Sequence, residues 1–314
     1  MADFFYKLDA TSIVDNPKYF VPARQVFGNF LFENELGILF GDTNSAKSIL
    51  STDIGLSFSS HVSHWDESMT DETIDGETYY YDLEQSTRQF ARRYMAAPFR
   101  KGKFERVSFS ILQYGEAGTE HLVSEVKSRM KANVPQLIII DNLQCILTRN
   151  FSPTKVKALM QQLKMLKDLH PLLTILLVAH TTKRDLNKPL NQNSMAGSKV
   201  IANFADSIFG ISESVTGSSC RYIKQIKSRE VSRADEVAIC EIYDHPYLHL
   251  ELIEYDTEVN HLAARKGAGR ISKIDEFVRN RIIELNEGGA TLREIQSELG
   301  ISKSHVHRIL REQV

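Results

Sequence analysis

The stretch "ILFGDTNSAKSIL" (38–50) joins an apolar run to a polar loop and then to a segment with helical spacing of apolar residues. Its loop follows the pattern G-x-x-x-x-G-K-[ST] from Gly41 to Ser48, except that Ala46 replaces the second glycine. A strand, a glycine-opened turn and a helix start in this order favour a phosphate-binding loop. The alternative is a structural turn whose lysine faces solvent.

Such a loop holds phosphates with inward-pointing backbone N–H groups and with the positive end of the helix that follows. Lys47 would reach the β- and γ-phosphates of ATP, and the Ser48 hydroxyl would bind Mg²⁺. Ala46 weakens the pattern by roughly 1 kcal/mol if its position needs positive φ, which is small beside nucleotide binding. The predicted ATP-binding segment comprises Gly41, Asp42, Thr43, Asn44, Ser45, Ala46, Lys47, Ser48 and Ile49.

Two acidic residues follow apolar runs downstream of this loop. The run "PQLIIIDN" (135–142) reads as a buried strand ending in Asp141, and "YYYDLEQSTRQFARR" (79–93) places Glu84 between a strand and a helix. A carboxylate at a strand end beside the loop can hold Mg²⁺, so Ser48 and Asp141 are the predicted metal ligands. Glu84 can polarise the water that attacks the γ-phosphate. The alternatives are a turn aspartate and a glutamate favoured by the helix dipole.

Short apolar runs alternate with helical stretches in the first two thirds of the chain, which predicts an α/β fold with a mainly parallel sheet. The last three of these runs read as strands buried on both faces. After residue 200, further strands are joined by short turns. We expect one α/β domain over 1–262, with a short N-terminal arm at 1–33. The apolar runs are 36–40, 78–83, 106–112, 136–141 and 172–180.

Net charge, cysteine spacing and the first residues of the chain limit the partners and the cellular compartment that we expect. The net charge of −2 gives no overall attraction to nucleic acid, so any such binding must come from local basic patches. Cys145, Cys220 and Cys240 lie far apart without metal-ligand spacing, which favours buried free thiols in a reducing compartment. The first residues lack the long apolar run of a signal peptide or membrane span. We expect a cytoplasmic protein without a membrane partner.

The segment around Glu84 resembles the strand and helix that follow the P-loop in DnaB-like and RecA-like ATPases. "LLVAHTTK" (176–183) is similar to the corresponding strand of RepA-type hexameric helicases. The resemblance covers roughly residues 25–255 and implies a RecA-like P-loop core. It implies that Glu84 is the catalytic carboxylate and that His180 is the polar sensor beside the Asp141 strand. The loop with Ala46 is similar to that of MCM helicases, where the departure is tolerated.

The resemblance also implies an oligomer. "YIKQIKSREV" (222–231) reads as a strand that ends in a K-x-R pair, Lys227 and Arg229. In DnaB-like proteins this pair enters the ATP site of the neighbouring subunit, where a guanidinium stabilises charge on the transferring phosphoryl group. Hydrolysis would then need a homo-oligomer, in this family a ring such as a hexamer, or a filament. The alternative is a basic strand end that faces solvent.

Two polar loops are candidate contacts for single-stranded DNA. The loop after His180 corresponds to a DNA-contacting loop in RecA-like folds, and long loops in compact domains are usually functional or disordered. The loop after Asp141 can add phosphate contacts. The alternative for both is a mobile surface loop. The basic residues are Lys183, Arg184 and Lys188 in the first loop, and Arg149 and Lys155 in the second.

The segment 270–314, after a polar linker at 260–270, reads as three helices and resembles a helix-turn-helix. The helix-terminus signals are Ser272 with Asp275, Thr291 with Glu294, Gly300 and Ser302. The expected small core is Ile295, Leu299, Ile301, Val306 and Leu310. The residues expected to face outward, of which the first five would contact duplex DNA, are Lys303, Ser304, His305, His307, Arg308 and Arg311. The alternative is a protein-docking unit.

The sequence therefore predicts a RecA-like ATPase domain (1–262) and a linker with an all-α helix-turn-helix domain (263–314). The expected function is ATP hydrolysis with Mg²⁺ coupled to DNA, as a replicative or mobile-element helicase or loader. The alternative is an ATP-regulated DNA-binding regulator that assembles on DNA without unwinding it.

Overall fold

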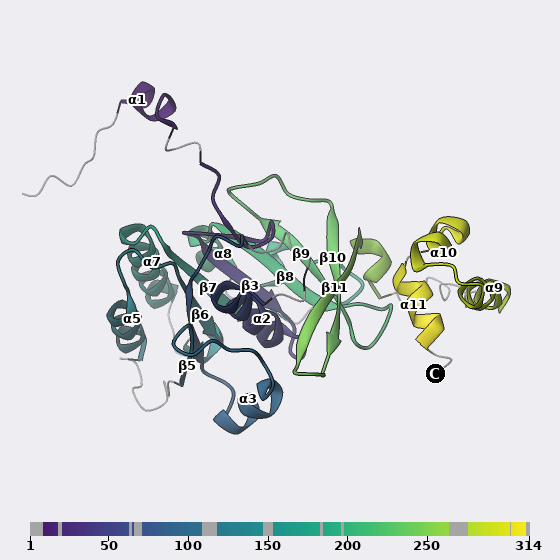
Figure 1. Cartoon of the computed structure of the whole chain (residues 1–314). Helices are drawn as coiled ribbons and strands as arrows, with labels where there is room; N and C mark the ends of the chain where they lie inside the picture. Colours follow the sequence, from purple (N-terminus) through teal and green to yellow (C-terminus); the bar gives the residue numbers. More distant parts are fainter. Residues whose placement is uncertain are drawn as a thin grey trace, which may run out of the picture.

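A nine-stranded sheet forms the centre of the computed structural model (Figure 1). The strand order is β11-β10-β9-β8-β3-β7-β6-β4-β5. The structure describes residues 9–17, 21–62, 65, 71–108, 118–146, 153–182, 185–195, 198–263, 276–301 and 303–311.

Six neighbouring strands of the sheet are parallel, and three antiparallel strands extend it at one side. The parallel strands are β3 (Leu36–Gly41), β4 (Glu77–Asp82), β5 (Phe104–Ser108), β6 (Gln136–Asp141), β7 (Leu173–His180) and β8 (Ser207–Glu213). The antiparallel strands are β9 (Cys220–Lys227), β10 (Glu236–Tyr243) and β11 (His249–Thr257). The predicted α/β fold with a mainly parallel sheet is confirmed.

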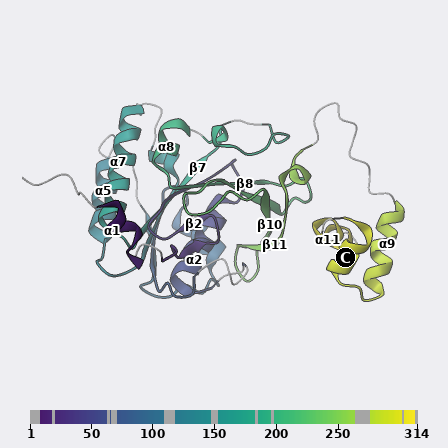
Figure 2. The same cartoon turned by 90° about the horizontal axis from the view of Figure 1, so that it is seen from above.

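Helices cover both faces of the sheet (Figure 2). One apolar layer packs beneath α5 (Gly118–Arg129), α7 (Pro153–Leu169) and α8 (Ser198–Phe204). The other packs against α2 (Lys47–Ser60) and a hairpin of β1 (Gln25–Phe27) and β2 (Leu31–Phe32). Successive residues of a strand enter opposite layers, so Ile38 and Leu39 belong to different clusters. This double coverage explains why every residue of β3 and β6 is buried.

The remaining helices complete the described chain. They are α1 (Ala10–Val14), α3 (Thr87–Tyr94), α6 (Leu143–Ile146), η4 (Gln192–Ser194) and η5 (Glu258–His261), followed by α9 (Glu276–Glu287), α10 (Leu292–Leu299) and α11 (Lys303–Arg311). None of the helices in the described ranges is long and apolar enough to cross a membrane.

Three details differ from the sequence prediction. The run 106–112 does not form a strand buried on both faces: β5 is the edge strand, pairs only with β4 and is partly exposed, and residues 109–112 lie outside the described part. Residues 25–33 are not an arm, because Phe27 and Leu31 are buried in the core. Of the three free cysteines, only Cys240 is buried.

The three C-terminal helices pack around Ile282, Ile295, Val306 and Ile309, with Leu299, Ile301 and Leu310 at the margin. Thr291 and Glu294 form the predicted capping box, and Gly300 ends α10 with a left-handed φ of 63°. Ser272, Asp275, Ser302 and the predicted linker from 264 onward lie outside the described residues. His261 is buried in η5, so the first residues of the polar stretch 260–270 belong to the α/β domain, which agrees with a boundary at 262.

Candidate nucleotide site

The loop between β3 and α2 has the backbone that its sequence pattern implies. Ala46 precedes α2 with φ 75° and ψ 20°, and Asn44 has φ 65°. Both non-glycine residues are therefore left-handed, so Ala46 bears the strain expected for a glycine position. A Cβ at Gly41 would lie 2.4 Å from the Ile211 carbonyl oxygen and 2.5 Å from Ser45 Oγ, so only glycine fits there.

Lys47 begins α2 and is buried, with 6% of its surface exposed. Its Nζ donates to the Asp42 carbonyl at 2.6 Å. Burial lowers the pKa of Lys47, while the charges of Asp141, Glu84 and Asp42 oppose this shift. The ammonium group therefore faces the carboxylates that the sequence assigns to the site.

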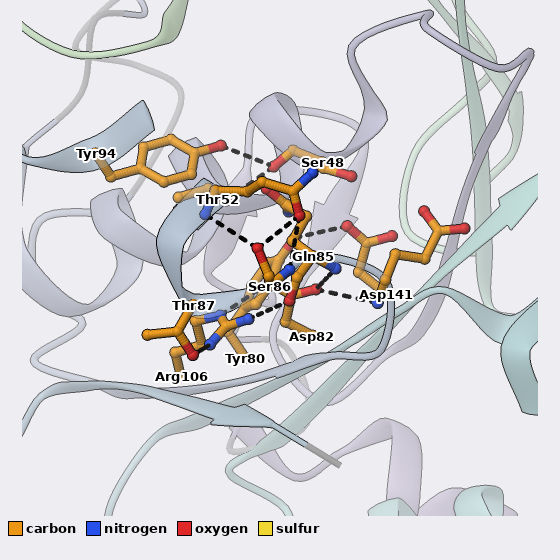
Figure 3. Close-up of polar contacts among 12 residues, drawn as sticks. Ser48, Thr52, Tyr80, Asp82, Gln85, Ser86, Thr87, Tyr94, Arg106 and Asp141 are labelled. Atoms are coloured by element: carbon orange, nitrogen blue, oxygen red, sulfur yellow. Dashed lines mark hydrogen bonds and ion pairs between the residues drawn. The ribbon is translucent and has the colours of Figure 1, made fainter. Parts of the chain in front are cut away.

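Asp141 ends β6 at the same level of the sheet as Asp82 on β4. Its Oδ2 accepts a hydrogen bond of 2.6 Å from the Tyr80 hydroxyl (Figure 3). Burial raises the pKa of Asp141, and hydrogen bonds from Ser48 and Tyr80 counteract the rise. Its Oδ1 is buried without a partner among the described residues.

These groups fit Mg²⁺. A buried carboxylate oxygen that lacks a partner, beside a serine hydroxyl, offers the oxygen ligands that this ion prefers. Within the described ranges, no three His, Cys, Asp or Glu side chains could hold a metal by themselves. Mg²⁺ is usually bound by one or two protein oxygens together with substrate phosphates.

Glu84 follows β4 and lies against His180, the last residue of β7. Glu84 Oε1 is 3.5 Å from His180 Nε2, and Asn142 Nδ2 is 2.9 Å from the same nitrogen. The hydrogen bond with His180, and further the Asn142 amide and the Lys47 charge, lower the pKa of Glu84 against the effect of burial. Glu84 is therefore ionised at neutral pH and held toward the loop.

A buried ion pair fixes the turn that carries Glu84. Asp82 Oδ2 accepts from Arg106 Nε at 2.9 Å, and Asp82 Oδ1 accepts from the backbone N–H of Gln85 at 2.8 Å (Figure 3). Arg106 also donates to the Gln85 carbonyl. Both oxygens of Asp82 accept hydrogen bonds within this turn. Of the two acidic residues at the end of β4, Glu84 is therefore the one available to the phosphate-binding loop.

The structure does not bring Lys227 and Arg229 to this site. Lys227 pairs with Ile208 near the start of β8, whereas the end of β3 at Gly41 pairs with Ile211. Lys227 Nζ donates to the carbonyls of Ala202 in α8 and of Ala205 just after it, and Arg229 pairs with Asp206 at 3.0 Å. The basic pair therefore lies toward the amino ends of the parallel strands, whereas the phosphate-binding loop lies at their carboxyl ends.

The predicted DNA contacts are only partly described. Lys183, Arg184, Arg149 and the side chains of Ser304, His305, Arg308 and Arg311 lie outside the described part. Lys188 is exposed and pairs with Asp185 at 3.2 Å, Lys155 is exposed on α7, and Lys303 is partly exposed. His307 is partly exposed, and its Nδ1 lies 4.0 Å from Glu241 Oε2 on β10. Its contact with DNA stays a prediction.

Sequence reasoning missed several supporting residues. Tyr80 and Asn142 contact Asp141 and His180 respectively, and Thr181 Oγ1 donates to Asp42 Oδ1. Arg221 on β9 donates to the Asn44 carbonyl at 3.3 Å. Asn142 could have been found as the polar residue directly after Asp141, but nothing near Arg221 in the sequence indicates its contact with the loop.

A family profile described as an AAA domain, AAA_25, matches residues 6–185, more than half of the chain. The chain belongs to this family. Among solved structures, it is similar to a KaiC-like protein from Pyrococcus horikoshii OT3, with a TM-score of 0.52, 16% identity and coverage of 74% of this chain and 100% of that one. A RadB recombinase gives a TM-score of 0.49 at 12% identity and covers 78% and 96%. No curated protein matches.

The AAA_25 match supports a P-loop ATPase, and the KaiC-like structure supports a RecA-like fold for its core. At 16% identity the structural likeness concerns the fold alone. The narrower resemblance to DnaB and RepA helicases and the helix-turn-helix stay predictions.

Proposed function

We propose that this protein binds ATP with Mg²⁺ and hydrolyses it. The observation that carries the proposal is the convergence of Lys47, Asp141, Glu84 and His180 at the carboxyl ends of four neighbouring parallel strands. Ligands of open α/β sheets bind at this edge. An ammonium group, a buried acid and an ionised acid are the charges that phosphoryl transfer to water requires.

Each residue has a distinct part in the proposed reaction. Backbone N–H groups of residues 41–48 and the Lys47 ammonium hold the phosphates. Ser48 and Asp141 would hold Mg²⁺, which neutralises charge on the phosphate oxygens when it is bound. Glu84, whose lowered pKa keeps it ionised, orients the attacking water and accepts its proton. His180 and Asn142 keep Glu84 in position.

We infer that a second copy completes the site. Lys227 and Arg229 lie toward the amino ends of the parallel strands, whereas the phosphate-binding loop of the same chain lies at their carboxyl ends. The basic pair can therefore reach a phosphate-binding loop only in another copy of the chain that stacks head to tail. A guanidinium supplied in this way stabilises the charge of phosphoryl transfer. The rival role is structural, since Arg229 already pairs with Asp206.

We propose DNA as the polymer to which hydrolysis is coupled, with α9–α11 as a helix-turn-helix that meets duplex DNA. The short turn at Gly300 between α10 and α11 supports this proposal. Deleting residues 268–314 should leave basal turnover intact and weaken duplex binding, with a smaller salt dependence. Unchanged affinity and salt slope would instead assign the three helices to protein docking.

Strand displacement separates a helicase from a regulator. Unwinding of a forked duplex with ATP supports the helicase or loader, whereas ATP-dependent footprinting without unwinding supports the regulator.

The ATP site itself is tested by Lys47→Ala, with Lys157→Ala on the exposed surface of α7 as the control. Calorimetric titration with Mg-ATP should show binding by wild type and control and none by Lys47→Ala, while circular dichroism stays unchanged. Equal binding by all three proteins would refute the site.

A further inference from the structure

Residues 85–104 form the most basic stretch of the chain. They contain six Arg or Lys residues and no Asp or Glu, although the whole chain has a net charge of −2. Helix α3 (Thr87–Tyr94) lies in this stretch, at the periphery of the molecule (Figure 1). Local charge of this kind attracts a polyanion even when the protein as a whole does not.

The two faces of α3 differ in chemistry. Phe90 and Tyr94 point inward, with ring centroids 4.8 Å apart, and Phe90 packs 6.3 Å from Tyr80. Arg88, Arg92 and Arg93 are exposed, and together they define what we call the α3 face. Met95 beside them is 89% exposed.

Two other basic residues of the stretch are paired with a carboxylate, whereas two on the α3 face are not, among the described residues. Asp75 pairs with Arg100 at 3.1 Å and with Lys103 at 3.0 Å. Arg88 and Arg92 contact no carboxylate among the described residues. Like charges at positions i and i+4 repel each other in a helix, so an anion between them would relieve that repulsion.

Helix α3 is also joined to the proposed reaction site. It begins just after Glu84, with Ser86 and Gln89 forming a capping box. Arg93 donates to Gln85 Oε1 at 2.9 Å, and Tyr94 Oη donates to the Ser48 carbonyl at 3.4 Å (Figure 3). Binding of a ligand to α3 can therefore affect both the segment that carries Glu84 and the first turn of α2 through these two hydrogen bonds.

We propose that the α3 face binds the phosphates of a nucleic-acid strand, and that this contact raises ATP turnover through Glu84 and Ser48. Guanidinium groups match phosphate oxygens in fork geometry. The part that concerns turnover rests on the proposed ATPase function, whereas the binding part does not.

The test is the full-length double variant Arg88→Gln/Arg92→Gln. The control is Lys127→Gln/Lys157→Gln, which removes the same charge from exposed positions of α5 and α7. Fluorescence anisotropy with a labelled oligothymidine of about 30 nucleotides measures binding without ATP. Two lost phosphate contacts should weaken binding roughly tenfold or more and lower the salt slope by about 1.4. Basal turnover should persist in both variants, and stimulation by oligothymidine should be lost only in the α3 variant.

Two outcomes would overturn the proposal. One is equal affinity and salt slope in the α3 variant and the control. The other is unchanged nucleic-acid binding together with loss of self-association by sedimentation, which would assign the α3 face to a second copy of the chain. If wild type shows no turnover, the ATPase proposal fails, and anisotropy still decides whether the α3 face binds nucleic acid.

Discussion

Replacing Tyr80 by phenylalanine removes the hydroxyl that donates to Asp141 at 2.6 Å. A hydrogen bond to a charged group contributes about 1.5–3 kcal/mol, and its loss should raise the pKa of Asp141 further above its ordinary value. Burial already raises this pKa, so ionisation of Asp141 opposes folding. Protonated Asp141 contributes its full share of the free energy of unfolding below the pKa that this carboxyl has in the unfolded chain. That contribution is lost as the pH rises through the higher pKa that the carboxyl has in the folded protein. The variant should therefore be less stable at pH 8, with a smaller deficit at acidic pH.

Tyr81→Phe is the matched control, because the adjacent Tyr81 hydroxyl is buried without a partner among the described residues. Its removal should be neutral or slightly stabilising. Urea unfolding without Mg²⁺, at pH 8 and at pH 5, compares the two variants.

The same change should affect catalysis, since loss of a hydrogen bond to a metal ligand weakens metal affinity about 10–100-fold. Tyr80→Phe should need correspondingly more Mg²⁺ for half-maximal turnover, and the acid limb of its pH profile should shift to higher pH. Identical unfolding curves and Mg²⁺ dependence for Tyr80→Phe and Tyr81→Phe would refute the role assigned to this contact.

Three further predictions concern other parts of the chain. Ala46→Gly should keep ATP affinity and change stability by no more than about 1 kcal/mol, since relief of the positive-φ strain offsets glycine entropy; a large loss of affinity would contradict this. Burial raises the pKa of Glu35 to about 7, so wild type should lose up to about 3 kcal/mol of stability between pH 4.5 and pH 8, and Glu35→Gln should not, as measured by urea unfolding. Arg229→Ala mixed with Lys47→Ala should recover turnover; no recovery in proven mixed oligomers would make Arg229 structural.

The order of elements along the chain was predictable, because the strands that carry the site are unbroken apolar runs that end in polar residues. Asp141 and His180 are the last residues of such runs, and they lie at one edge because parallel strands end together. The prediction that β5 is buried on both faces was wrong, because apolar content alone does not reveal that a strand lies at the edge of the sheet.

Contacts across the sheet could not be predicted. Arg106 meets Asp82 because β5 pairs beside β4, and Arg221 meets Asn44 because β9 folds back along β8. Strand neighbours and register depend on the packing of the whole sheet, so they cannot be read from the local pattern of each segment. For the same reason, the sequence predicted that Lys227 and Arg229 lie at the end of a strand. It did not indicate whether this end lies beside the carboxyl or the amino ends of the parallel strands.

Phosphate release from Mg-ATP by wild type and by Glu84→Gln, measured in parallel with nucleotide binding, tests the central claim most directly. The amide keeps the shape of the side chain but cannot accept a proton. We predict that Glu84→Gln binds Mg-ATP as wild type does and loses turnover about 100-fold or more. Equal phosphate release by the two proteins would contradict the assignment of Glu84 as the catalytic carboxylate.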